Sequence, residues 1–396
     1  MDNQQTKQRV SRIARGVLAV RPLADALKHP IRALPMNDEG ALSLPSGHAS
    51  RIEAVINDVA ARIGAPRFKV VSDASDQSVF ESVISNRLAL GPDVVVDGDF
   101  GCHPDEIGEL VAEAVGEDFD ARFSRAKVRS FDGAMLRSYS AGAPRRGTVA
   151  LVAACGMPAK LCERWMRFLG ESHFVITWES RLLFEDLTAD QEWAYDVDAH
   201  VADLFAVMDH YGVRQAHLMG LCGGAVVAIA AAAKRRDRVR SLSLWHGDYE
   251  LGSACPKTRH QKDLQALMAV AASSQSQAEQ IHQMFSHNLL KNFRKDLAHV
   301  VLYPYANSQL LHRYGKSNGN IMQTNVSSLL SQATQPSLVV TSEDDNTAHP
   351  AGSMFVAERL PNARLQVEKH GDHLSIFDAR SHVTEAASRF LETVGY

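Results

Sequence analysis

Residues 215–233, QAHLMGLCGGAVVAIAAAA, decide the fold that this sequence predicts. A short apolar run enters a turn that carries Cys222, and an alanine-rich run leaves it, so the pattern predicts a strand, a sharp turn and a helix. Gly220 and Gly224 suit a turn where two backbones approach too closely for a side chain. Cys222 is then expected beside the helix N-terminus, which favours a thiolate. The alternative is a buried, unreactive cysteine.

Composition places the chain among ordinary globular proteins. It has 396 residues, of which 45% are hydrophobic and 22% are charged, and this length is typical of two or three domains. A formal net charge of -4 argues against a nucleic-acid partner held by a basic face. The N-terminal apolar stretch is too short for a signal peptide or a membrane span. The cysteines are scattered without a C-x-x-C pair, which favours a reducing, cytoplasmic location; they are Cys102, Cys155, Cys162, Cys222 and Cys255.

Three segments are expected. Residues 1–45 predict one or two helices interrupted by prolines. Residues 46–122 predict a small α+β domain, and its expected elements are a helix over 51–63, strands over 68–71, 87–90 and 94–96, and a helix over 104–117. Residues 123–396 predict an α/β domain with a helical insertion at about 250–330.

The second segment has a weak resemblance to zinc metallopeptidases of the membrane-protease type. The stretch NRLALG at 86–91 stands where that family has a strand, and the helix over 104–117 stands where it has H-E-x-x-H. Glu113 and Glu117 then replace the zinc histidines, and Ala114 replaces the catalytic glutamate. The resemblance implies a degenerate scaffold, with no metal site and no cofactor.

In the third segment, runs typical of buried strands alternate with helical patterns, which predicts a mostly parallel sheet. A hairpin is expected around Asp132-Gly133. The expected strands are 126–130, 134–140, 148–154, 174–178, 216–219, 239–245, 337–341 and 364–367. Reactive side chains of such sheets lie beyond the carboxyl ends of the strands.

Residues suited to nucleophilic catalysis follow three of the predicted strands. Cys222 follows one, Asp345 follows the strand at 337–341, and His373 follows the strand at 364–367. This order of nucleophile, acid and base resembles the α/β-hydrolase superfamily, with cysteine in place of the usual serine. The resemblance implies the α/β-hydrolase fold with a helical lid. The neighbouring residues Asp344 and His370 are less favoured alternatives, and Asp248 is a further candidate acid.

The chemistry assigns roles to these residues. His373 would accept the Cys222 proton, and Asp345 would fix and stabilise the imidazole. The oxyanion needs two N–H donors, for which the backbones of Gly223 and Met157 are the candidates. The Met157 loop resembles the family's His-Gly oxyanion turn, except that Cys155 replaces the histidine. Cys155 and His246 are candidates for lining the pocket.

An acyl-cysteine is itself a thioester, so the acyl group that it carries stays activated. The resemblance to branches of the superfamily that have cysteine as the nucleophile therefore implies acyl transfer. The predicted function is an acyltransferase or cyclase that takes its acyl group from an acyl carrier protein or coenzyme A. The insertion, with Met268 and Met284, is expected to be a lid over an apolar acyl chain. The alternative is a hydrolase of the thioesterase or dienelactone-hydrolase type, and a second alternative is a non-catalytic scaffold. Neither a nucleic acid nor a membrane is expected as a partner, and a homodimer is left open.

Overall fold

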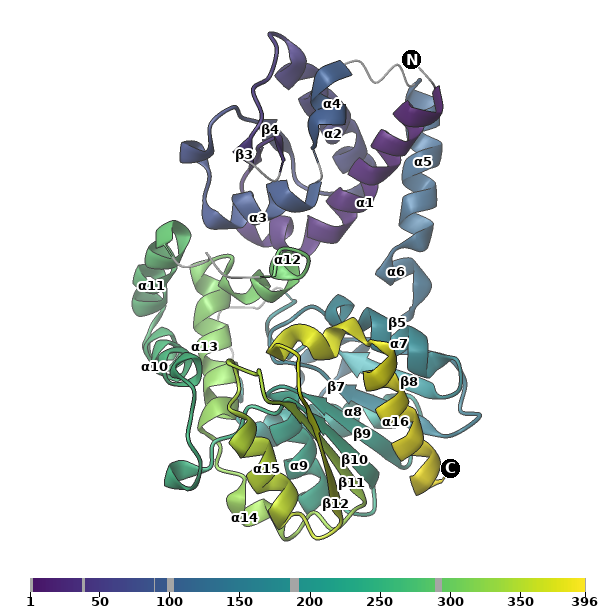
Figure 1. Cartoon of the computed structure of the whole chain (residues 1–396), viewed down its shortest axis with the longest axis vertical. Helices are drawn as coiled ribbons and strands as arrows, with labels where there is room; N and C mark the ends of the chain where they lie inside the picture. The colour runs from purple at the N-terminus through teal and green to yellow at the C-terminus, as the bar shows by residue number, and fades with distance from the viewer. Residues whose placement is uncertain are drawn as a thin grey trace. The chain divides into compact units, whose positions relative to one another are not determined.

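The computed structural model describes residues 3–37, 40–88, 90–97, 103–185, 192–288 and 294–395. It divides into two compact units (Figure 1). The N-terminal unit combines Met1–Arg122 with Glu279–Leu311, and the sheet unit combines Phe123–Ala278 with His312–Tyr396. Cys102 lies outside the described residues. No helix within the described ranges is long and apolar enough to cross a bilayer.

The sheet unit is built on eight strands in the order β12-β11-β10-β9-β7-β8-β6-β5. Strands β7 to β12 are mutually parallel, whereas β6 pairs antiparallel with both β8 and β5. The predicted mostly parallel sheet and its hairpin are therefore confirmed. The strands are β5 (Ser124–Arg129), β6 (Met135–Ala141), β7 (Thr148–Val152), β8 (Phe174–Trp178), β9 (Ala216–Leu221), β10 (Val239–Trp245), β11 (Ser337–Ser342) and β12 (Ala363–Glu368).

Helices cover both faces of this sheet. On one face α9 packs on β9 and β10, with α8 and α14 beside it, and α15 packs on β11 and β12. On the other face Trp165 of α7 contacts Trp245 of β10, and Phe390 of α16 contacts His217 of β9. Both tryptophans are fully buried, so the core extends on both sides of the central strands. The helices are α7 (Glu163–Gly170), α8 (Val197–His210), α9 (Gly224–Lys234), α10 (Arg259–Ser273), α14 (Ser327–Leu330), α15 (Pro350–Arg359) and α16 (Ser381–Val394).

The N-terminal unit is mainly helical. Its long first helix packs on the second, third and fifth, and two short strand pairs complete the unit: β1 with β4 and β2 with β3. The elements are α1 (Asn3–Leu27), α2 (His48–Ile63), α3 (Val79–Leu88), α4 (Pro92–Asp97), α5 (Pro104–Glu117), α6 (Phe119–Arg122), α12 (Ala298–Val301), β1 (Ile31–Ala33), β2 (Met36–Asn37), β3 (Gly40–Ala41) and β4 (Phe68–Val70).

Two of the strands predicted here are wrong. Arg87 and Leu88 end α3, and residues 94–96 lie in α4, so the strands required by the metallopeptidase resemblance are helical at these positions. The helices are specified locally: Pro92 occupies the first position of α4, where proline is favoured. Glu117 pairs with Arg15 of α1 at 3.0 Å, which accounts for one of the glutamates at the expected zinc positions.

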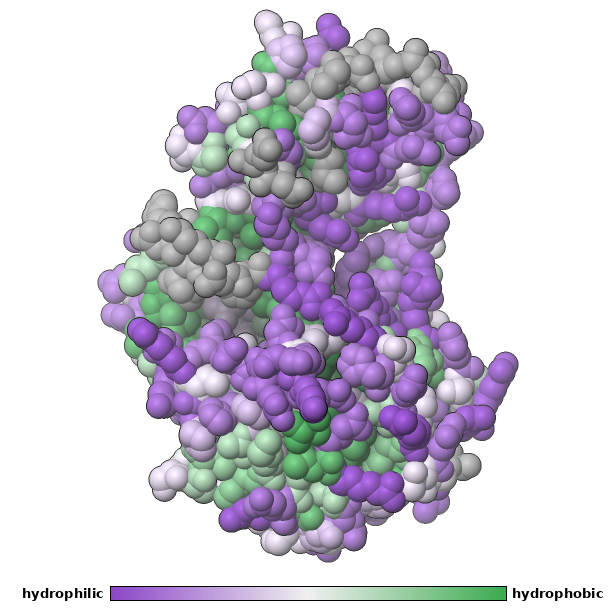
Figure 2. All heavy atoms as spheres, in the orientation of Figure 1, coloured by the Kyte–Doolittle hydropathy of each residue, from purple (hydrophilic) through white to green (hydrophobic). Residues whose placement is uncertain are grey.

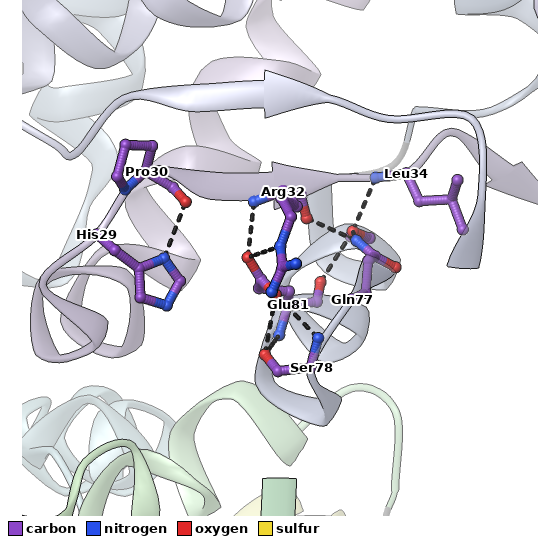
Figure 3. A network of polar contacts seen from close by, with 8 residues as sticks. His29, Pro30, Arg32, Leu34, Gln77, Ser78 and Glu81 are labelled. Atoms are coloured by element: carbon purple, nitrogen blue, oxygen red, sulfur yellow. Dashed lines mark hydrogen bonds and ion pairs between the residues drawn. The ribbon is translucent and has the colours of Figure 1, made fainter. Parts of the chain in front are cut away.

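A buried carboxylate explains where α3 begins (Figure 3). The Glu81 side chain is fully buried and accepts hydrogen bonds from the Ser78 amide at 2.9 Å and from the Arg32 guanidinium at 2.7 Å. Burial alone would raise the pKa of Glu81, but these donors lower it, and the carboxylate stays charged. This pairing caps α3 and fastens it to β1, and it overrides the strand-like pattern of the residues that follow.

The predicted insertion is shared between the two units. Its helices α11 (Gln275–Asn288) and α13 (Ser308–Gln323) each cross from one unit to the other. Met268 is fully buried against Gly315 and Gly319 of α13, so it packs two insertion helices together. Met284, on the segment that belongs to the N-terminal unit, is 67% exposed.

Candidate active site

The turn between β9 and α9 has the predicted geometry. Cys222 has a positive φ of 53°, a conformation that is strained for any residue with a side chain. Its amide donates to the Trp245 carbonyl at 3.0 Å, and its carbonyl accepts from the Ala225 amide at 3.0 Å. The strain and these bonds hold the thiol at the tip of the turn, and the side chain is half-buried.

Both flanking glycines are required by close backbone approach. A Cβ atom at Gly224 would lie 2.0 Å from the Val152 carbonyl oxygen. A Cβ atom at Gly220 would lie 2.6 Å from Cα of Ala225. These are the two positions at which the sequence predicted that no side chain fits.

The imidazole of His373 lies in a buried pair with Asp345. Its Nδ1 is 2.9 Å from Oδ2 of Asp345, and both side chains are almost inaccessible to solvent. The other carboxylate oxygen, Oδ1, accepts from the amides of Thr347 and Ala348 at 2.9 Å each. Three hydrogen bonds thus hold the acid, and two of them come from its own loop, which fixes its orientation.

The electrostatics of this pair favour its charged form. Burial alone would raise the pKa of Asp345, but His373 and His246 lower it far below its usual value. Burial alone would lower the pKa of His373, but the Cys222 and Asp345 charges raise it well above its usual value. Nε2 of His373 is buried and makes no hydrogen bond among the described residues. The base is therefore free to exchange a proton with a group on the thiol side.

His246 joins the same carboxylate. It is 2% exposed, and its Nδ1 lies 3.2 Å from Oδ2 of Asp345. Its φ of 45° places this residue, immediately after β10, in the left-handed region. The structure therefore brings His246 to the acid itself. Two histidines and one carboxylate form a group whose ligating atoms lie within 4.8 Å of one another.

The less favoured alternatives form their own, separate contacts. Nδ1 of His370 lies 3.0 Å from Oδ2 of Asp344, and both side chains are exposed. The half-buried Asp248 accepts from Nε2 of Gln261 at 2.6 Å, and burial raises its pKa. Of the candidate acids, only Asp345 is hydrogen-bonded to His373 within the part of the chain that the structure describes.

The two expected oxyanion donors differ. The Gly223 amide makes no hydrogen bond among the described residues, so it remains available. The Met157 amide instead donates to the Ala154 carbonyl at 3.3 Å, in a turn where Gly156 has a φ of 79°. To act as the second donor to an oxyanion, the Met157 amide would have to break its long hydrogen bond to Ala154.

Cys155 lies in a polar network behind that turn. Its sulfur is 3.4 Å from Oγ of Ser317, which in turn is 2.9 Å from Nε2 of His200. Burial raises the pKa of Cys155 to about 11, so this second thiol stays protonated at neutral pH. Cys155, His200 and Ser180 line a cavity of about 20 Å³. Ser317 lies on α13, so the insertion contributes directly to this loop.

Tyr249 is a residue of the site that the sequence did not single out. It is 4% exposed, and its hydroxyl makes no hydrogen bond among the described residues. Burial, and secondly the charge of Cys222, raise the pKa of this phenol. The signal in the sequence was its place in Trp245-His246-Gly247-Asp248-Tyr249, directly after a strand that ends at the site.

Comparisons with known proteins agree with this architecture. A family model described as the α/β-hydrolase fold matches residues 166–379, slightly more than half of the chain. The RutD protein of Pseudomonas savastanoi pv. phaseolicola, named for carbamate hydrolysis, is 25% identical over 197 residues, 48% of this chain and 71% of RutD. RutD of Caulobacter segnis is 25% identical over 255 residues, 62% of this chain and 92% of that relative. A thermophilic esterase from Thermogutta terrifontis superposes with a TM-score of 0.55 at 19% identity over 69% of this chain and 100% of the esterase.

Proposed function

Because the chain belongs to the α/β-hydrolase fold family, we propose that it hydrolyses an activated acyl compound through a covalent intermediate on Cys222. The observation that carries the proposal is the strained elbow cysteine beside a buried His373–Asp345 pair. The nucleophile, base and acid come from three strand ends of one sheet, and a constellation of these three roles catalyses acyl hydrolysis on several unrelated folds.

Acylation would start with transfer of the Cys222 proton to Nε2 of His373. The thiolate sulfur then attacks the acyl carbon, and the C–O, C–S or C–N bond to the leaving group breaks as the tetrahedral oxyanion collapses. The proton held on His373 passes to the leaving group. Asp345 keeps the imidazole in the required tautomer and stabilises its positive charge.

Deacylation would use the same base on water. His373 removes a proton from the water molecule, the resulting hydroxide adds to the thioester carbonyl, and the C–S bond to Cys222 breaks. The proton returns to the thiolate, and the free acid leaves. The Gly223 amide, which makes no hydrogen bond among the described residues, would donate to the oxyanion in both halves, and the Tyr249 hydroxyl is a candidate for the second donor.

Hydrolysis fits the comparisons better than the acyl transfer or cyclisation expected from the cysteine. The relatives are named for carbamate hydrolysis, and their names describe no transferase. One observation still favours transfer as a second candidate: the nucleophile is a thiol, and an acyl-cysteine retains the energy of a thioester. Acyl groups on coenzyme A or on an acyl carrier protein are then the substrates to compare with simple esters and carbamates.

Product analysis distinguishes these possibilities. The full chain would be incubated with 4-nitrophenyl esters, acyl-coenzyme A thioesters and aryl carbamates, with and without an added amine or alcohol acceptor. Hydrolysis predicts free acid (from a carbamate, the amine with carbon dioxide) whose yield is unchanged by the acceptor. Conversion of most of the acyl group to an amide or ester would instead support transfer.

The matched control is Cys162→Ala, which removes a fully buried thiol at the end of the short helix Ala159–Cys162. It should turn over the same substrates as the unaltered protein, whereas Cys222→Ala should turn over none. Equal activity of Cys222→Ala would overturn the proposal.

A further inference from the structure

Strand β12 is an edge of the eight-stranded sheet. It pairs in parallel with β11, and no other strand pairs with it among the described residues. In Figure 1 it lies at the end of the sheet, between α15 and α16. An edge strand presents unpaired backbone groups, which makes it a template for pairing with another strand.

The direction of those backbone groups follows from its bonds to β11. The carbonyls of Asn362 and Glu368 accept from the amides of Ser337 and Glu343, at 2.8 and 2.9 Å. Backbone groups of successive residues alternate between the two edges of a strand. The even-numbered residues of β12 therefore bond to β11, and the N–H and C=O groups of residues 363, 365 and 367 point away from the sheet.

The sequence of β12, Ala-Arg-Leu-Gln-Val-Glu over 363–368, is complementary to itself in one antiparallel register. A two-fold axis at Gln366 places Arg364 of one copy opposite Glu368 of the other, and Leu365 opposite Val367. In this register residues 365 and 367 form the hydrogen-bonded pairs, as their outward backbone groups require. Registers centred on Leu365 or Val367 do not place these opposite charges together.

The exposed side chains fit such a contact. Leu365 is 43% exposed, although it lies in a strand. Arg364 is exposed and makes no ion pair or side-chain hydrogen bond within the described ranges. Beside the strand, Leu338, Leu365, Ala386 and Phe390 contribute to a groove of about 630 Å³ whose rim carries Arg389 and Glu392. Figure 2 shows hydrophobic residues on this lower part of the surface.

We propose that β12 pairs antiparallel with β12 of a second copy of this chain, about a two-fold axis at Gln366, and so joins two sheets into one. The partner is a second copy for the following reason. The register in which the outward backbone groups form hydrogen bonds also places Arg364 opposite Glu368 on both sides of the two-fold axis. One face of the joined strands carries the two Arg364–Glu368 pairs, and the other carries the two Leu365–Val367 contacts. An isologous contact of this kind closes on itself and gives a dimer.

Charge reversal tests the register. Analytical ultracentrifugation of the full chain, over about a hundredfold range of concentration, should show conversion to twice the monomer mass of 43.4 kDa. Arg364→Glu and Glu368→Arg should each weaken the dimer by about tenfold or more, because like charges then face each other. The double variant should restore it to within about threefold. Arg259→Glu, the same charge change on an exposed helical residue, should have no effect.

A second measurement covers the case in which Glu368→Arg disturbs the strand, since Glu368 accepts from Gln366 Nε2 at 2.6 Å. Hydrogen exchange of the unaltered chain should slow at the amides of Leu365 and Val367 as concentration rises, and not at the exposed end of α10. A chain that stays monomeric throughout, a dimer indifferent to Arg364→Glu, or amides without concentration-dependent protection would each overturn the proposal.

Discussion

Nδ1 of His246 and Nδ1 of His373 lie 3.2 and 2.9 Å from the same oxygen atom, Oδ2 of Asp345, with their ring centroids 5.9 Å apart, and of these two contacts only that of His373 has hydrogen-bond geometry. One carboxylate thus contacts two imidazoles and is hydrogen-bonded to one of them. Because the acid is buried, each of these neighbours has a large effect on its charge and orientation. His246 therefore acts on the candidate base through Asp345, as a positioning residue.

Removal of His246 should impair the base without removing it. We expect His246→Ala to lower kcat/KM about tenfold, equivalent to about 1.4 kcal/mol, and to change the pH profile of activity because Asp345 loses a neighbour that favours its charge. His370→Ala removes an exposed histidine from the adjacent pair with Asp344 and should change kcat/KM less than about twofold. Identical pH profiles for the unaltered protein and His246→Ala would contradict this role.

The identity of the acid can be tested by two matched substitutions. Asp345→Asn should lower kcat by about 10³–10⁴, the size of loss expected when the tautomer of a catalytic histidine is no longer fixed. Asp248→Asn should lower it far less, because Asp248 is bonded to Gln261 and not to His373. The kinetics of both variants should be compared after circular dichroism confirms that they fold. A larger loss in Asp248→Asn would transfer the assignment of the acid to Asp248.

The raised pKa of His373 makes stability depend on pH. A group whose pKa is higher in the folded state contributes its full stability below the unfolded value, about 6.5 for histidine, and loses it as pH rises through the folded value. Cys222 is the largest of the causes that raise this pKa. From neutral to alkaline pH the free energy of unfolding should therefore fall more in the unaltered protein than in Cys222→Ala. Thermal unfolding across this range measures it, and parallel curves for the two proteins would exclude the coupling.

The close approach at the elbow should make one glycine irreplaceable. Gly224→Ala would place a Cβ atom 2.0 Å from the Val152 carbonyl oxygen, and we expect a loss of about 3 kcal/mol or more, or failure to fold. The matched control is Gly116→Ala in α5, where the added Cβ would meet no atom within 4 Å apart from its chain neighbours and the backbone of its own helix. That variant should gain about 0.5–1 kcal/mol, because alanine is the better helix former. Denaturant unfolding of both variants gives the comparison, and a Gly224→Ala protein of unchanged stability would show that the turn can relax.

The sequence identified the elbow and the sheet because their signals are local and unambiguous. Gly220 and Gly224 stand at fixed spacing around Cys222, and strands buried on both faces give continuous apolar runs. The preference for Asp345 over Asp344 and for His373 over His370 was made by family analogy. The structure separates them by burial, since one pair is exposed and the other is not.

Other features depend on contacts that spacing does not encode. Residues 94–96 have the composition of a strand, yet Pro92 and the surrounding helices place them in α4. The sequence marked His246 as pocket-lining, but its contact with Asp345 arises only when β10 and β11 are adjacent. Likewise the assignment of α12 to the N-terminal unit follows from its packing on α1 and α3, far away in sequence.

The most direct test of the central claim is the intact mass of the protein during a single turnover. The full chain would be mixed with an acyl-thioester, quenched in acid within seconds and analysed by mass spectrometry with peptide mapping. The account predicts one acyl group on Cys222, which disappears as free acid forms. In His373→Ala the acyl group should either not form or persist for longer. Product formation with no adduct on Cys222, or an adduct confined to another cysteine, would contradict it.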